Sequence, residues 1–429
     1  NMEFLDKCLA LMKEKGADEG EVSLTHVQNE EMELKNGNID LLRSRDEYYL
    51  NLNAIIEKKR ASIQINKIDE EAIAEAVSEL IHNAENSQID EANGVSDQVQ
   101  ERDFNNCKDN YDPELMYKRL ENFNKEVIAA YPDLVLEGAV LEYQKRYNYY
   151  RNSKGVNLSS NHDNYFFSTS FFGRRDRETS SMNYTGIALE NLDEELYELA
   201  SLPYLLRESV EHLDARIIDN KKFTGDLIIT PDCLRSILYS LLSHLGNDML
   251  IAGTSYFKDS LDKKVLDGKF TLKTEPVSDL LAIKDYYSGD GVVNLNDYIF
   301  AEGVLKNYLL DFYGSRKTGL QRGPSLGSNL VVEAGDKSIA EMVESVERGI
   351  ILARFSGGQP ASNGDFSGVA KNSYYVEDGE IKYPIKETMI SGNLFSLFQN
   401  IMGISKDRIN FGYSLMPFLH AKEIVVSSR

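Results

Sequence analysis

The residues best suited to holding a ligand lie in a glycine-rich stretch near the C-terminal end, SGGQPASNGDFSG, residues 356–368. Glycine permits positive φ and a close approach of another backbone, and the polar residues between the glycines offer amides and a carboxylate. The candidates for contact with a substrate are Gly357, Gly358, Asn363, Gly364, Asp365 and Ser367. Two interpretations stay open: the loop touches another chain or a peptide backbone, or it only turns a corner.

Histidines are the next candidates, because a hydrolytic zinc site usually needs two of them on one face of a helix. The six histidines lie far apart, and no two of them share a helix face: His26, His82, His162, His212, His244 and His420. His244 lies at the margin of an apolar stripe, which favours a boundary residue over a ligand. We therefore assign no catalytic residue and no metal ligand, and we expect no cofactor in this chain.

Two other kinds of site lack their sequence signatures. The chain has no G-x-S-x-G elbow, no Walker A loop and no G-x-G-x-x-G that follows a strand. The segment GPSLGSN, residues 323–329, resembles a phosphate-binding loop but lacks the lysine. It is predicted to be a simple loop.

An aromatic and basic run, YQKRYNYYRN at 143–152, could stack single-stranded bases, as could NYFFSTSFFGRR at 164–175. However, Ala139, Leu141, Tyr143, Tyr147 and Tyr149 alternate, so in a strand they share one face. The alternation favours a strand that buries its core side.

Composition limits the partners and the compartment. The net charge is −22, from 47 basic and 69 acidic residues, and such a chain is repelled by nucleic acids and anionic membranes. Three scattered cysteines indicate a reducing compartment. The acidic N-terminal segment does not look like a signal peptide, and no apolar stretch is long enough to span a membrane, so we expect a cytoplasmic protein.

The periodicity predicts an α+β fold: two helix–β-meander–helix units followed by a larger β-rich C-terminal domain. The predicted domains are residues 1–105, 106–222 and 223–429. The first unit has a helix near residues 4–12, an Asn-Gly turn in KNGNI between two strands, and a second helix followed by a polar linker that extends to Asp112. The second has a helix at 113–130, strands over 134–189 and a helix over 191–214.

The third domain opens with a buried strand that leads directly into a helix, TGDLIITPDCLRSILYSLLSHLG. Thr230 is the predicted N-cap and Pro231 the first helical residue. Further on, YYVEDGEIKYPIKETMI is predicted to form a hairpin that turns at Asp378 and Gly379.

The segment GDFSGVAKNSYYVEDGEIKYPIKETMISGNLFSLFQNI, residues 364–401, resembles the C-terminal signature of the TldD/PmbA family, and in particular of its PmbA (TldE) branch. YRNSKGVNLSS at 150–160, GTSYF at 253–257 and AEGVLKNYLLDFYGSRKTGL at 301–320 resemble other segments of the family in the same order. The resemblance covers nearly the whole chain.

The resemblance implies a cytoplasmic heterodimer of a TldD-like and a PmbA-like chain that acts in peptide maturation and in the proteolysis of unfolded polypeptides. It also implies that zinc lies in the TldD-like partner, on a helical H-E-x-x-x-H motif and a cysteine near the C-terminus. The corresponding helix of this chain, PDCLRSILYSLLSHLGND, has a lone histidine, and Phe411 stands where many relatives have the cysteine. The older name of the family, modulator of DNA gyrase, agrees poorly with the net charge of −22.

These departures imply a non-catalytic subunit, with peptidase activity expected only in complex with a TldD-like partner and with an unfolded or extended peptide as substrate. Two alternatives remain open: a homodimeric peptide-binding or scaffold protein without protease activity, and a hydrolase with an unrecognised site.

Overall fold

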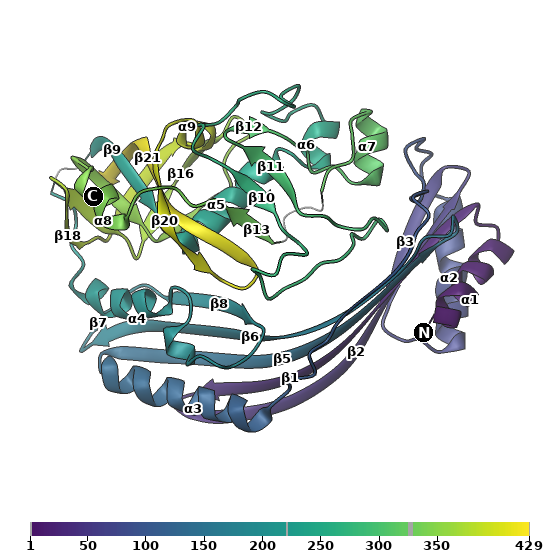
Figure 1. Cartoon of the computed structure of the whole chain (residues 1–429), viewed down its shortest axis with the longest axis horizontal. Helices are drawn as coiled ribbons and strands as arrows, with labels where there is room; N and C mark the ends of the chain where they lie inside the picture. Colours follow the sequence, from purple (N-terminus) through teal and green to yellow (C-terminus); the bar gives the residue numbers. More distant parts are fainter. Residues whose placement is uncertain (1, 220–221, 325–328, 429) are drawn as a thin grey trace.

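The Asn-Gly pair predicted to reverse the chain does so between two long strands. Asn36 and Gly37 have φ of 51° and 78°, the positive values that a type I′ hairpin turn requires. In the computed structural model, which describes residues 2–219, 222–324 and 329–428, this hairpin belongs to an eight-stranded sheet with the order β3-β2-β1-β5-β6-β4, to which β7 and β8 add by pairing with β6 (Figure 1). The strands are β1 (Glu19–Lys35), β2 (Asn38–Ile56), β3 (Lys59–Ile65), β4 (Glu101–Asn106), β5 (Leu134–Asn152), β6 (Asn157–Arg175), β7 (Glu178–Thr179) and β8 (Asn183–Leu189).

Helices cover the two ends of this long sheet (Figure 1). Near the N-terminus, α1 (Met2–Glu14) and α2 (Glu70–Glu85) pack Leu5, Val77 and Leu80 against buried residues of β1 and β2. At the other end, α3 (Pro113–Ala130) packs Phe123 edge-on against Phe167 of β6. Both α2 and α3 begin at an aspartate whose side chain accepts a hydrogen bond from a backbone amide of the first turn.

The predicted linker before Asp112 is wrong in part, because residues 101–106 form β4. This strand pairs in parallel with the start of β6. Its alternating acidic residues bond across the pair: Glu101 accepts from Asn157, and Asp103 accepts from the Ser159 hydroxyl at 2.7 Å. A strand held by polar side chains from a distant segment has no local apolar alternation, so the sequence pattern did not indicate it.

The helix predicted over 191–214 is shorter than expected. Only α4 (Leu202–Glu211) is α-helical, with single 3₁₀ turns η1 (Leu196–Glu198) and η2 (His212–Asp214) on either side. Pro203 is the reason for the late start, because proline is tolerated in the first turn of a helix but not in its interior. The helices predicted at the N-terminus, at 113–130 and after Thr230 are confirmed.

The C-terminal region forms a thirteen-stranded mixed sheet, in which the central strand β21 pairs with β9, β13, β19 and β20. The predicted turn at Asp378 and Gly379 is confirmed between β17 and β18, with φ of 52° and 73°. The strands are β9 (Lys222–Ile229), β10 (Leu272–Thr274), β11 (Asp297–Ala301), β12 (Val304–Leu305), β13 (Leu330–Val332), β14 (Arg348–Leu352), β15 (Arg354–Gly357), β16 (Asp365–Lys371), β17 (Tyr374–Glu377), β18 (Glu380–Pro384), β19 (Thr388–Asn393), β20 (Ile401–Asn410) and β21 (Ser414–Ser428). The helices are α5 (Pro231–Ser243), α6 (Asn247–Ile251), α7 (Phe312–Thr318), α8 (Ile339–Glu344) and α9 (Leu394–Gln399).

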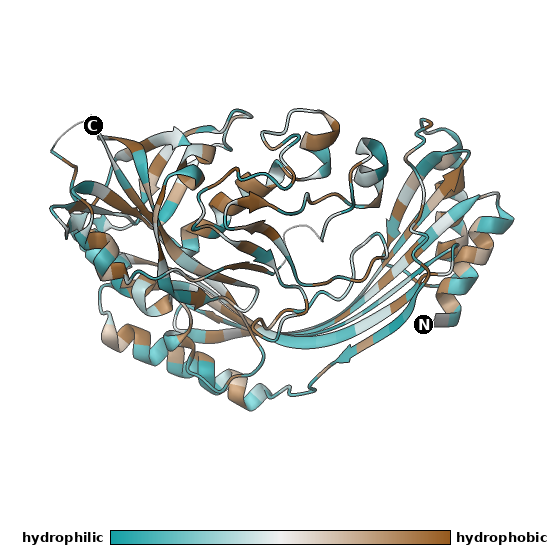
Figure 2. Cartoon of the chain, turned by 45° about the horizontal axis from the view of Figure 1, so that its top comes forward, coloured by the Kyte–Doolittle hydropathy of each residue, from teal (hydrophilic) through white to brown (hydrophobic). Residues whose placement is uncertain are grey.

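The predicted α+β class with a large β-rich C-terminal domain is confirmed. Figure 2 shows apolar colouring concentrated in the C-terminal strands, whereas the middle of the long sheet is mainly hydrophilic. Strands from both predicted N-terminal units share the long sheet, and the domain boundaries stay a prediction. None of the helices in the described ranges combines the length and the apolar character that crossing a membrane requires.

The aromatic and basic run lies in strands, as the alternation predicted. Ala139, Leu141 and Tyr143 of β5 are buried in one core cluster, and the Tyr143 hydroxyl donates to Asp163 at 2.6 Å. Tyr150 points to another cluster and donates to Glu21. Tyr147 and Tyr149 are only half-buried, so the predicted core face holds for residues 139–143 but not for the end of the strand.

Candidate functional site

The candidate site lies where two parallel strands of the C-terminal sheet end. Strands β9 and β14 pair in parallel, and ligands of open sheets commonly bind beyond the carboxyl ends of such strands. Here β9 leads into α5 and β14 leads into β15. Between them and β8 of the long sheet is a cavity of about 320 Å³, which we call the arginine pocket, and its polar lining includes Tyr184, Asp232, Arg235, Tyr239, Arg354 and Tyr413.

Aromatic rings hold both arginines of the pocket. The guanidinium carbon of Arg235 lies 4.4 Å from the centre of the Tyr413 ring, and that of Arg354 lies 3.8 Å from the centre of the Tyr184 ring. Arg354 also donates from Nε to Asn183 at 2.7 Å and to the Tyr184 carbonyl. In the described part of the chain, neither arginine forms a salt bridge with a carboxylate.

Burial disfavours the charged forms of the neighbouring acid and thiol. Burial raises the pKa of Asp232, whose Oδ1 accepts a hydrogen bond from the Ser201 hydroxyl at 2.9 Å. Burial also raises the pKa of the Cys233 thiol to about 12, although Arg354 opposes the change. The pocket therefore combines two guanidinium cations with a protonated thiol and with a carboxyl group whose charged form burial disfavours.

This donor set does not fit a zinc ion. Zinc takes thiolate, neutral imidazole or carboxylate ligands, and Cys233 keeps its proton far above neutral pH. Arg235, two residues further along α5, places a cation in the same pocket. His244 follows the last turn of the helix; it is buried, and its Nδ1 accepts from the Tyr256 amide at 3.2 Å.

A carboxyl group behind the pocket should make stability depend on pH. Burial and the neighbouring Asp232 raise the pKa of Glu208, on α4, from 4.5 to about 8. The folded state therefore holds this proton more tightly than the unfolded state does, so the stabilising contribution is complete below about pH 4.5 and is lost as pH rises through 8. We expect Glu208→Gln to raise the free energy of unfolding by about 2 kcal/mol at pH 9, a value reduced because the side chain is partly exposed. At pH 5 the increase should be much smaller, because Glu208 is then protonated in the folded state.

Denaturant unfolding of both proteins at the two pH values measures this difference. Glu194→Gln, at an exposed position of the loop before α4, is the matched control and should change stability little at either pH. An equal effect of Glu208→Gln at pH 5 and pH 9 would contradict the assigned pKa.

Two of the six predicted site residues line a second cavity beside the first. Gly357 ends β15 and Gly358 follows it, and both line a cavity of about 150 Å³ that we call the apolar pocket. Its other walls include Ile237, Leu352, Phe366, Leu394 and Leu397. Ser236 and Phe355 line both pockets, so the two cavities are neighbours along α5 and β15.

Three other predicted residues lie together in an internal network. The Asn363 amide donates to Asp365 Oδ2 at 2.8 Å, and the Asn393 amide donates to both the Asn363 carbonyl and Asp365 Oδ1 at 2.9 Å. Gly364 has a φ of 89°, and a Cβ there would lie 2.6 Å from the Phe395 ring. This network orients Asn393, whose side chain caps α9. Contact with a substrate stays a prediction for Asn363, Gly364 and Asp365, which here turn a corner.

Ser367, the sixth residue, is separate from both groups. It is exposed on β16 and pairs with Ser391 of β19. The loop predicted at 323–329 lies mostly outside the described residues, which exclude 325–328.

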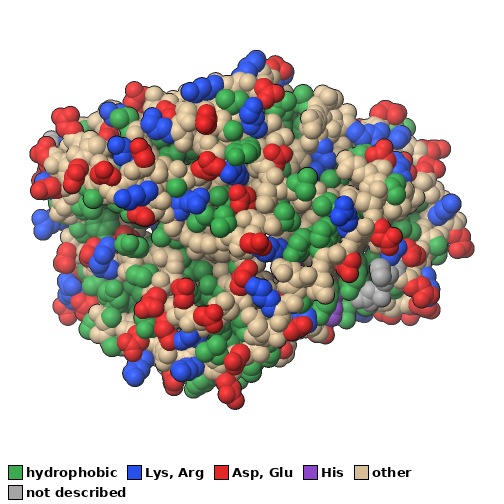
Figure 3. All heavy atoms as spheres, in the orientation of Figure 1, with side chains coloured by type: hydrophobic (Ala, Val, Ile, Leu, Met, Phe, Trp, Pro, Cys, Tyr) green, Lys and Arg blue, Asp and Glu red, His purple; other side chains and the backbone are tan. Residues whose placement is uncertain are grey.

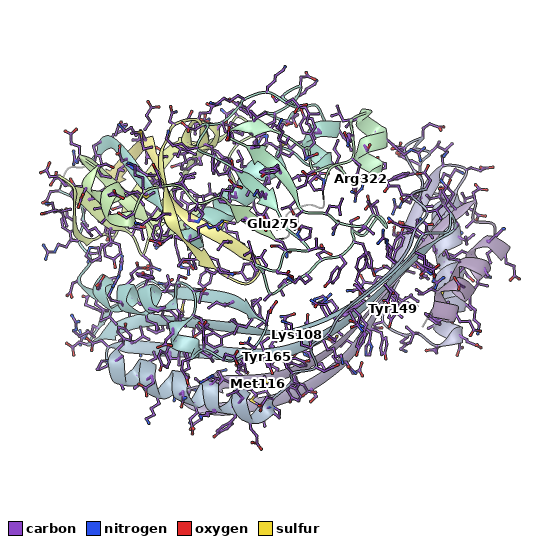
Figure 4. All side chains as sticks on the ribbon, in the orientation of Figure 1. Lys108, Met116, Tyr149, Tyr165, Glu275 and Arg322 are labelled. Carbon is purple, nitrogen blue, oxygen red and sulfur yellow. The ribbon has the colours of Figure 1, made fainter. Side chains whose placement is uncertain are left out.

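A larger cavity of about 590 Å³ lies between the N-terminal segment and the C-terminal region. Both of its arginines pair with a carboxylate of the same cavity: Arg60 with Glu21 and Arg322 with Asp290, both at 2.7 Å. Figure 4 labels Arg322 on the C-terminal side and Tyr149 on the long sheet, with side chains between the two regions. The arginine pocket, whose cations lack such partners, is the stronger candidate.

Sequence reasoning missed Arg235 and Arg354, the two residues that define the site. The available signal was the strand-to-helix junction at Thr230, because residues after a buried strand gather at the carboxyl edge of a sheet. The partner strand β14 is short and its successor Arg354 is distant in sequence, so their meeting depends on the parallel pairing of β9 with β14.

Comparisons with known proteins agree on one family. Residues 223–428 match the model of the PmbA/TldA metallopeptidase C-terminal domain. A zinc metalloprotease TldD homolog of Saccharolobus solfataricus is 28% identical over 58% of this chain and 62% of its own. Metalloprotease PmbA of Escherichia coli O157:H7 is 26% identical over 49% of this chain and 48% of its own. The chain therefore matches less than two thirds of the length of either relative.

A solved structure gives the same fold. TldE from Thermococcus kodakarensis superposes with a TM-score of 0.85 over 99% of this chain and 100% of its own, at 17% identity. At that identity, the similarity establishes the shared architecture alone.

Proposed function

Because this chain is a member of the PmbA/TldD family, we propose that it is the non-catalytic, PmbA/TldE-like subunit of a cytoplasmic zinc metalloprotease complex. The complex acts in peptide maturation and in the proteolysis of unfolded polypeptides. The TldD-like partner supplies the zinc and the cleavage, and this chain supplies binding surface for the substrate.

The observation that carries the proposal is the chemistry of α5. The resemblance places the zinc-binding helix of TldD-like chains at α5, and here that helix presents Asp232 and Arg235 to the pocket. Phe411, at the position of the cysteine, is buried and lines the same pocket. A pocket with two arginines is suited to holding an anion and not to holding a metal cation.

An extended substrate suits the sheet edges of this fold. Strand β15 pairs with β16 and with no other described strand, so part of its second edge can accept the backbone of an added chain. Such hydrogen bonds depend little on side chains, as a protein that handles diverse unfolded segments requires. The face in Figure 3 carries interspersed acidic and basic side chains, and the net charge of −22 argues against nucleic acid as partner.

Mixing the purified chain with a TldD-type chain tests the proposal. We expect the native mass to rise to that of a heterodimer and the mixture to cleave an unfolded, casein-like fluorescent substrate that this chain alone leaves intact. If the mass stays at that of a homodimer and no cleavage appears, the chain is a scaffold or peptide-binding protein. If this chain cleaves the substrate alone after metal removal, it is a hydrolase with its own site.

A further inference from the structure

Building on the proposed function, we infer that the arginine pocket and the apolar pocket form one groove that binds an extended polypeptide. A carboxylate of the polypeptide lies between Arg235 and Arg354, and a neighbouring apolar side chain fills the cavity beside Gly357 and Gly358. The carboxylate is either the C-terminus or an acidic side chain of the bound segment.

The first part of the argument is the state of the two arginines. In a chain with 69 acidic and 47 basic residues, arginines readily find carboxylates, as Arg60 and Arg322 do. Arg235 and Arg354 line one cavity and are stacked on Tyr413 and Tyr184 instead. Arg354 gives two of its donors to Asn183 and the Tyr184 carbonyl. Stacking itself uses no hydrogen-bond donor, so the remaining donors of the planar fork can still match a carboxylate.

The second part is the neighbouring apolar pocket. A cavity of about 150 Å³ has room for a group the size of benzene, and this pocket has about that volume, with a mainly apolar lining that also includes Ser236, Ser240 and Gln359. A Cβ at Gly357 would lie 2.7 Å from the Phe355 ring, and one at Gly358 would meet no atom within 4 Å. The space beside Gly357 is taken by the chain's own Phe355 ring and Ser367 carbonyl, so Gly358 is where bare backbone leaves room for another backbone to come close.

The third part identifies the ligand as a polypeptide. A small anion would use the arginine pocket alone, whereas the two pockets share Ser236 and Phe355 and so lie within reach of neighbouring side chains of one chain. The Phe355 amide already bonds to the Cys233 sulfur, so the edge of β15 left for an added strand is the part near Gly357.

Peptide binding to the isolated full-length chain tests the inference, and needs no partner or metal. The probe is a fluorescein-labelled, unstructured ten-residue peptide that ends in Leu-Glu with a free carboxylate, measured by fluorescence anisotropy. Four matched probes differ from it as follows. The first has a C-terminal amide, the second has glutamine in place of the glutamate, and the third has both of these changes and so has no carboxylate at its C-terminal residue. The fourth has serine in place of the leucine. The amide and glutamine probes distinguish a terminal from a side-chain carboxylate.

We expect the probe without any C-terminal carboxylate to bind at least about tenfold more weakly, the cost of losing a hydrogen bond to a charged group. Arg235→Gln should weaken binding of the acidic probe by a similar factor and leave the doubly neutral probe unaffected. Arg174→Gln is the matched control, because Arg174 is an exposed arginine over the Phe172 ring outside both pockets. It should leave every affinity unchanged.

Gly358→Leu tests the apolar pocket independently. The position has free space around it, so the variant should fold, and its side chain should compete with the leucine of the probe. Equal affinities for all probes, or unchanged binding in both Arg235→Gln and Gly358→Leu, would overturn the inference. If the mixture with a TldD-type chain cleaves peptides but this chain shows no such binding, the groove is refuted and the proposed function stands. If this chain binds the probes as expected but forms no complex with a TldD-type chain, the groove stands and the proposed function is refuted.

Discussion

A chelator applied to this chain alone, and then removed, is expected to leave the peptidase activity of the reconstituted complex unchanged. The same treatment of the TldD-type partner should reduce activity on the order of 100-fold or more, because a catalytic zinc supplies the activated water. The asymmetry follows from α5, where Asp232 bonds to Ser201 and the Cys233 thiol has a pKa of about 12. The thiol is therefore not a ready ligand at neutral pH, and one oxygen of Asp232 is already occupied by a hydrogen bond.

The measurement is cleavage of a fluorescent unfolded substrate after each subunit has been treated separately and then mixed. Adding zinc back to the treated partner should restore activity, which controls for loss of folded protein. Zinc bound stoichiometrically to this chain, together with loss of activity after its treatment alone, would contradict the assignment of a non-catalytic subunit.

Features set by adjacent residues could be predicted from the sequence. The turns at Asn36-Gly37 and Asp378-Gly379 depend on residues that tolerate positive φ, and both form where predicted. The helix that begins at Pro113 has its capping aspartate immediately before it. In these cases the stabilising partners are close in sequence, so the pattern alone identifies them.

Features set by distant pairing could not be predicted in this way. β4 exists because Glu101 and Asp103 meet Asn157 and Ser159 on β6. The arginine pocket exists because β8, α5 and β15 converge. Distant pairing also separates the residues of the glycine-rich stretch. Gly357 and Gly358 line a cavity, whereas Asp365 accepts a hydrogen bond from Asn393.

Gly412→Ala is expected to lower the free energy of unfolding by about 3 kcal/mol or more, or to prevent folding. Gly412 has a φ of 77°, and a Cβ there would lie 1.8 Å from the Ala188 carbonyl oxygen of β8. That contact is with a backbone atom, which cannot rotate away as a side chain can. The clash could be relieved only if β8 moved away from residues 411–413. The Phe411 carbonyl also accepts from the Ala188 amide at 2.9 Å, so the same shift breaks a hydrogen bond.

A matched glycine separates the two causes of the loss. Gly319, which caps α7, has a φ of 73°, but a Cβ added there would meet no atom within 4 Å, so Gly319→Ala should cost only about 1 kcal/mol of backbone strain. Denaturant unfolding measures the loss of stability in each variant. The additional loss in Gly412→Ala is then the cost of the clash with β8, which lies close to the C-terminal region. Equal losses in the two variants would mean that β8 yields easily, and that Tyr184 and Tyr413 are not held together across the arginine pocket.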